Sequence, residues 1–134
     1  MRITGQCHCA NITYEADVDP TQLQVCHCED CQRLSGSPFR ASIPTKNLTF
    51  TRGQPKVYIK LTAASGRKRA QAFCPDCGSP FYAGPAEPTP DAVYNLRFGT
   101  INERAQLTPY RAIWCETAVP WAEDISGLPK VRGQ

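Results

Sequence analysis

The sequence predicts a mainly β domain with little helix. Short runs in which apolar and polar residues alternate recur along the 134 residues, and many are rich in the β-branched and aromatic residues that favour strands. Glycine and proline punctuate these runs at short intervals, as turns between strands require. No segment keeps an apolar period of 3.6 residues for more than about two turns, so long helices are not expected.

The individual elements follow from local patterns. Residues 10–17 alternate apolar and polar side chains, and Asp19-Pro20 then marks a turn. One helical turn is expected just before Gly36 and Pro38, which would end it. In chain order, strands are expected at 10–17, 23–25, 39–43, 48–51, 57–61, 69–73, 81–83, 93–98 and 110–114.

The composition is that of an ordinary folded protein, with 41% apolar and 20% charged residues. We expect a single domain over residues 1–134. A net charge of +3 is too mild to predict a nucleic-acid partner, and the longest apolar runs are too short to span a membrane. Residues 1–6 lack the apolar stretch of a signal peptide. A reducing, cytoplasmic location is therefore expected.

The eight cysteines are the most informative residues. In a secreted chain an even number would suggest disulfides, whereas in a reducing compartment it favours metal binding or catalysis. Cys7 and Cys9, like Cys26 and Cys28, form Cys-x-Cys pairs that are too close for an unstrained bridge but well spaced to chelate. The spacing favours metal over disulfides.

Three thiols gather in one hexapeptide, at Cys26, Cys28 and Cys31. Thiolate is a ligand that Zn²⁺ binds well in a tetrahedral site. A structural zinc normally has four protein ligands, whereas a catalytic zinc keeps one position open. This three-thiol cluster therefore predicts either an open zinc site or a site completed from elsewhere in the chain.

A second motif, Cys74-Pro75-Asp76-Cys77-Gly78, is a zinc knuckle whose turn aims two sulfurs at one point. It needs two further ligands, and Cys7 and Cys9 are the simplest donors. We therefore predict a closed four-thiolate structural site, the four-thiol cluster, made of Cys7, Cys9, Cys74 and Cys77. Such a site contributes directly to folding.

Cys115 decides between the two forms of the three-thiol cluster. It stands alone in an apolar stretch, where a cysteine is more often a small buried hydrophobic residue than a ligand. We therefore favour the open site; ligation by Cys115 would close it.

His8 and His27 each lie between two cysteines and could ligate zinc. In an extended Cys-x-Cys stretch the middle side chain points away, which favours hydrogen bonds that support the ligands or lie at the surface.

The motifs together resemble one known family. They are Gly5-x-Cys7-His8-Cys9, Cys26-His27-Cys28-x-x-Cys31 with Gly36 and Phe39, Phe73-Cys74-x-x-Cys77-Gly78-Ser79-x-Phe81-Tyr82, and Pro120-Trp121. Their order along the chain is similar to that of the glutathione-dependent formaldehyde-activating family, also called the centromere protein V/GFA family.

The resemblance implies an Mss4-like β-tent of short antiparallel strands around two zinc ions. Cys7, Cys9, Cys74 and Cys77 match the family's structural ligands, and Cys26, Cys28 and Cys31 match those of its catalytic-type zinc. It also implies a zinc-dependent carbon–sulfur lyase-type activity that joins formaldehyde and glutathione as S-hydroxymethylglutathione. The partner would then be a small thiol or aldehyde adduct, with glutathione as the family's own.

Two arginine-containing segments bear on this hypothesis. Arg33, two residues after Cys31, is close enough in sequence to face the open site and bind a carboxylate of a peptide-like thiol; it could equally be a surface cation. Arg67-Lys68-Arg69 could be a solvated strand edge or an anion site. This basic run, and the absence of the histidine that relatives carry near residues 109–113, motivate the alternative: a non-catalytic zinc module that binds a thiol, a protein or nucleic acid.

Overall fold

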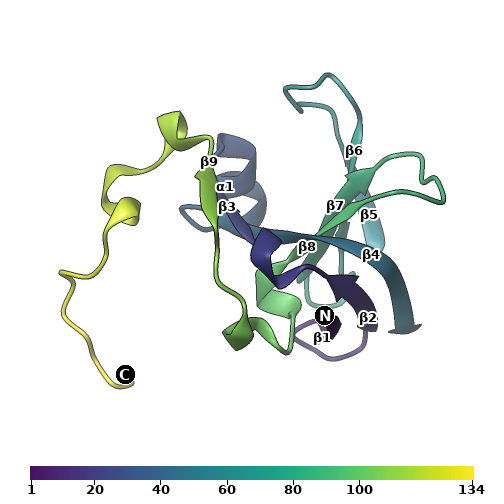
Figure 1. Cartoon of the computed structure of the whole chain (residues 1–134), viewed down its shortest axis with the longest axis horizontal. Helices are drawn as coiled ribbons and strands as arrows, with labels where there is room; N and C mark the ends of the chain where they lie inside the picture. Colours follow the sequence, from purple (N-terminus) through teal and green to yellow (C-terminus); the bar gives the residue numbers. More distant parts are fainter.

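The computed structural model describes residues 1–134, and nine strands form its one sheet (Figure 1). The path of the sheet is β1-β2-β4-β8-β7-β6-β5, with β3 paired to β4 and to β9. All pairs are antiparallel except β3 with β9. The strands are β1 (Arg2–Gln6), β2 (Thr13–Val18), β3 (Gln24–Cys26), β4 (Arg40–Arg52), β5 (Lys56–Lys60), β6 (Arg69–Phe73), β7 (Pro80–Pro85), β8 (Tyr94–Arg97) and β9 (Arg111–Ile113).

Helix is confined to one α-helix and five short 3₁₀ turns, which confirms the mainly β prediction. The helix is α1 (Glu29–Ser35), and the turns are η1 (Pro20–Gln22), η2 (Phe98–Thr100), η3 (Arg104–Gln106), η4 (Cys115–Thr117) and η5 (Pro120–Glu123). No helix here combines the length and the apolar character needed to cross a membrane.

Three elements of the structure, β1, β4 and α1, differ from the prediction. Strand β1 was missed because, although its burial alternates strictly, one of its two buried residues is Gly5, so Ile3 is its only apolar side chain on the buried side. Gly5 is required there, since a Cβ would lie 2.1 Å from Cζ of Tyr14. The strands predicted at 39–43 and 48–51 are one strand, β4, which continues through Pro44.

The helix is longer at its start than predicted. It begins at Glu29 because Sγ of Cys28 accepts a hydrogen bond from the backbone N–H of Cys31, with the two atoms 3.3 Å apart. Gly36 ends the helix in the left-handed conformation (φ 64°), as expected of a glycine at a helix C-terminus.

The central sheet has one apolar and one polar face. The apolar face packs the buried core, which includes Ile3, Tyr14, Ile43, Ala72, Phe81 and Leu96. Neighbouring residues in a strand point to opposite faces, so Ser42 and Arg97, paired across β4 and β8, lie on the other side from Ile43 and Leu96. The polar face also carries Arg40, Lys60, Arg69 and Gln71, by register or by alternation.

After β9 the chain leaves the sheet and runs down one side of the molecule to a C-terminus far from the rest of the fold (Figure 1). Most residues after Val119 are exposed, including Trp121. These residues form a surface segment.

Candidate metal centres

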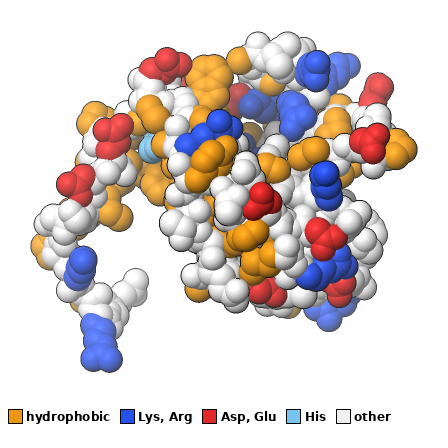
Figure 2. Space-filling view, viewed as in Figure 1, with side chains coloured by type: hydrophobic (Ala, Val, Ile, Leu, Met, Phe, Trp, Pro, Cys, Tyr) orange, Lys and Arg blue, Asp and Glu red, His pale blue; other side chains and the backbone are white.

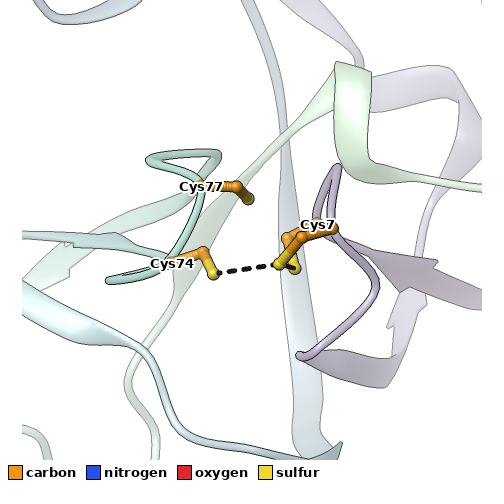
Figure 3. A group of neighbouring side chains, drawn as sticks. Cys7, Cys74 and Cys77 are labelled. Carbon is orange, nitrogen blue, oxygen red and sulfur yellow. Dashed lines mark hydrogen bonds between the residues drawn. The ribbon is translucent and has the colours of Figure 1, made fainter.

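The four-thiol cluster joins two distant parts of the chain. Cys7 and Cys9 follow β1, and Cys74 and Cys77 lie in the turn between β6 and β7; Figure 3 shows Cys7, Cys74 and Cys77 converging. All four sulfurs lie within 4.8 Å of one another, with 3.6 Å between Cys7 and Cys9 and 3.9 Å between Cys9 and Cys74. A tetrahedral zinc with Zn–S bonds of about 2.3 Å separates its sulfurs by about 3.8 Å. The residues therefore fit a metal of this kind.

Backbone and hydroxyl groups hold these sulfurs in place. The N–H of Ile12 donates to Sγ of Cys7 at 3.4 Å, and Gly78 (φ 76°) closes the knuckle by donating to the carbonyl of Cys74 at 2.8 Å. The hydroxyl of Ser79, 3.2 Å from Sγ of Cys77, lowers the pKa of that thiol to about 5. Ser79 thus favours the thiolate of Cys77, the form that binds metal.

The three-thiol cluster is built locally around the start of α1. Cys26 is the last residue of β3, Cys28 caps the helix and Cys31 lies in its first turn, so the three sulfurs also lie within 4.8 Å of one another. Cys26 and Cys31 are buried, whereas Cys28 is partly exposed. This donor set fits the same kind of metal through three thiolates.

No histidine joins either group of sulfurs. His8 is exposed, as expected of a surface residue. His27 is buried, its ring centroid lies 5.5 Å from that of Phe39, and its Nδ1 has no hydrogen-bond partner. The expected supporting or surface hydrogen bond is therefore not made by this atom.

Cys115 lies outside both clusters. It is exposed at the start of η4, so the prediction that it is a small buried residue was wrong. The stretch is less buried than its apolar sequence suggested, because β9 pairs only along β3 at the margin of the sheet. The geometry brings together Cys26, Cys28 and Cys31 without a fourth cysteine.

A cavity of about 470 Å³ opens beside Cys28. We term it the Cys28 pocket; its lining includes Cys28, Arg40, Lys60, Arg69, Gln71 and Trp114. Inside it, Nζ of Lys60 lies 2.8 Å from Oδ2 of Asp30, which also accepts a hydrogen bond from Thr62. These two partners hold the pKa of Asp30 below its ordinary value.

Buried positive charge surrounds the three-thiol cluster. Arg40 pairs with Cys26 across β3 and β4, and Arg97 lies one strand further along. Burial and the charge of Arg40 lower the pKa of Arg97 to about 9. A hydrogen bond from Cys26, followed by the charges of Arg40 and Arg97, lowers the pKa of Cys31 to about 5. The same hydrogen bond and burial raise the pKa of Cys26.

The basic residues that the sequence suggested as anion-binding residues lie in different parts of the structure. Arg33 is exposed and lines another hollow, on the side of α1 next to Val119 and Trp121. Arg67 and Lys68 are exposed between β5 and β6, whereas Arg69 is half-buried at the start of β6, an internal strand. The strand-edge interpretation was therefore wrong for Arg69.

Arg40 was not identified from the sequence. It directly follows Phe39 in a strand-like stretch, where alternation with the apolar Phe39, Ala41 and Ile43 predicts a solvent-facing side chain, so no local signal marked it as buried. Its pairing with Cys26 depends on a contact between β3 and β4, which no local pattern specifies.

The fold and the two clusters define a class: small β proteins with two cysteine clusters that fit metal ions on one mainly antiparallel sheet. The family model described as glutathione-dependent formaldehyde-activating enzyme matches residues 2–117. The chain belongs to this family, as its motifs predicted.

Two further comparisons agree with the fold and the family. A Schizosaccharomyces pombe protein named as an uncharacterized lyase is 31% identical over 78 residues, which is 58% of this chain and 54% of the relative. The chain thus matches about half the length of that protein. A crystal structure of a Rhodobacter sphaeroides protein superimposes with a TM-score of 0.58 at 18% identity, covering 81% of this chain and 98% of the other. This second likeness concerns the fold.

Proposed function

We propose that the protein is a zinc-dependent carbon–sulfur lyase-type enzyme that acts on a small thiol adduct such as S-hydroxymethylglutathione. One observation carries the proposal: the three-thiol cluster offers three thiols and borders a cavity through Cys28, whereas the four-thiol cluster offers the four ligands that a closed zinc site needs. A zinc site with three protein ligands is the arrangement typical of catalysis. Family membership and the lyase-named relative support the reaction class.

Each cluster would hold one zinc ion in a single domain, with a structural role for Cys7, Cys9, Cys74 and Cys77. Cys26, Cys28 and Cys31 would hold the catalytic-type ion. When bound there, zinc would supply Lewis acidity and a soft site for sulfur. The charges of Arg40 and Arg97 would compensate the thiolates, and Arg33 remains a candidate for substrate contact from the far side of α1.

The reaction needs no redox partner. Cleavage breaks the C–S bond of the adduct; the hydroxyl group loses its proton to become the aldehyde, and the departing sulfur takes up a proton as the thiol. The chain would bind the adduct in the Cys28 pocket and orient its sulfur towards the cluster, so that the reacting groups meet in one site.

Exchange NMR on mixtures of formaldehyde and glutathione tests this function. We expect zinc-loaded protein to accelerate exchange between free and adduct forms by at least about 100-fold over the Cys28→Ser variant, as expected when a catalytic group is lost. Cys115→Ser is the matched control, because this exposed thiol lies outside both clusters. Exchange that is no faster with unmodified protein than in buffer would refute the proposal.

The alternative, a non-catalytic zinc module, predicts binding without turnover. The exposed Arg67 and Lys68 are the feature that could serve a nucleic-acid partner. Binding of that kind would weaken steeply with salt. Salt-independent binding would remove these residues from consideration.

A further inference from the structure

Arg40 has an unusual environment for a charged side chain. Its exposed fraction is 8%, its Nε has no hydrogen-bond partner, and its guanidinium forms no salt bridge. Burying a charge without a partner is costly, and buried arginines are normally paired. The protein therefore keeps a buried cation that lies near the thiolates but has no carboxylate partner in its own chain.

The neighbouring carboxylates do not supply that partner. Asp30 is paired with Lys60 and accepts a hydrogen bond from Thr62, and the exposed Glu29 and Glu116 stand at the rim of the pocket. Arg69, half-buried in the same lining, also forms no salt bridge. Two arginines are thus left without a carboxylate in one cavity.

The polar face of the sheet fixes where this charge lies. Lys and Arg side chains gather on the upper part of the molecule in Figure 2, between the segment that carries α1 and β9 and the β5–β6 hairpin. Arg40 lies directly across from Cys26 in the β3–β4 pair, and Arg40 and Cys28 line the same cavity. An anion bound by Arg40 would therefore lie beside the three-thiol cluster.

We propose that Arg40, assisted by Arg69, binds a carboxylate of the substrate in the Cys28 pocket, so that the enzyme acts on thiol adducts that carry a carboxylate. This inference rests on the proposed function, whose substrate class it narrows. A planar guanidinium matches a carboxylate through two parallel hydrogen bonds. The pocket volume of about 470 Å³ leaves room for the chain that links that carboxylate to the sulfur.

A second role for Arg40 is charge compensation of the thiolates alone. The two roles predict different relative affinities of the pocket for an acid and its amide. A counter-charge that the thiolates neutralise would not favour the acid over the amide, whereas a carboxylate site would. Arg97, hydrogen-bonded to Gln71 at 2.9 Å, already supplies buried positive charge near the cluster.

The test compares two unreactive probes, 3-(methylthio)propanoate and 3-(methylthio)propanamide, on full-length zinc-loaded protein. Trp114 lines the pocket and Trp121 does not, so a Trp121→Phe background leaves one tryptophan to report binding by fluorescence. We expect the acid to bind about 10- to 100-fold more tightly than the amide, as for a hydrogen-bonded charge pair.

Substitutions locate the preference. Arg40→Gln should abolish the preference for the acid over the amide. Arg40→Lys keeps the charge but loses the bidentate geometry, so this variant should retain both zinc ions and lose most of the preference. Arg111→Gln removes the same charge from an exposed position outside the pocket and should keep it. Loss of the preference in Arg33→Gln but not in Arg40→Gln would place the carboxylate on the far side of α1 and overturn the proposal.

Failure of this inference differs from failure of the proposed function. Equal affinity for acid and amide in the otherwise unmodified protein would overturn the carboxylate site and leave Arg40 as a counter-charge, even if formaldehyde and thiol turn over. A clear preference for the acid without any turnover would support the site and refute the enzyme.

Discussion

The two cysteine clusters use the same ligand atom in different surroundings, although each combines buried and more exposed cysteines. Cys7 and Cys74 are part of the hydrophobic core, at 1% and 0% exposure, and their cluster ties β1 to the β6–β7 turn. Cys26, Cys28 and Cys31 lie outside that core, and Cys26 lies on the polar side of the sheet. Each cluster borders a cavity through one cysteine, Cys7 or Cys28. Thiolate ligands alone therefore do not decide whether such a site is structural or catalytic. The number of ligands and the face of the sheet that adjoins the site decide between these roles.

The largest expected effect is loss of folding when a ligand of the four-thiol cluster is removed. Cys74→Ser removes a fully buried ligand, and structural zinc in small peptides contributes roughly 10–16 kcal/mol. This matches or exceeds the whole stability of a typical domain, about 5–15 kcal/mol. We expect unfolded or aggregated protein by circular dichroism. A folded variant that still holds two zinc ions would refute the structural role.

A smaller effect on stability is expected when a ligand of the three-thiol cluster is removed. Cys28→Ser should leave the protein folded with one zinc ion instead of two, measured by elemental analysis. Serine is itself a good N-cap, so the cap of α1 survives and the melting temperature should fall by no more than about 5 °C. If Cys28→Ser and Cys74→Ser unfold alike, the division between the clusters is wrong.

The smallest effect concerns two glycines in matching conformations. Gly78 closes the knuckle and Gly36 ends α1, with φ of 76° and 64° and no atom within 4 Å of the position that an added Cβ would take. Alanine at either position costs about 1 kcal/mol of backbone strain, equivalent to about 4 °C in melting temperature. We expect Gly78→Ala to show that loss in full. Gly36→Ala should lower the melting temperature less, because the last turn of α1 can fray and relieve part of the strain. A larger thermal loss for Gly36→Ala would contradict the comparison.

The strands were predictable where their signal was local. The pattern of 69–73 predicted β6 with the same bounds, because Ala70 and Ala72 alternate with polar residues; the burial of Gln71 between them was not predicted. Strand β1 was not predicted, because its place depends on pairing with β2 and on Tyr14 filling the space above Gly5. For the same reason β4 was predicted as two strands. Its continuity through Pro44 is set by neighbours on both sides.

By itself the sequence determined the mainly β class, the family and the division of seven cysteines into groups of four and three. Ligand spacing is a local property of the chain, so short motifs carry it. Only the tertiary structure placed Arg40 opposite Cys26, left Arg33 on the far side of α1 and exposed Cys115. These placements depend on which strands pair and in what register, and long-range pairing is not encoded in any single segment.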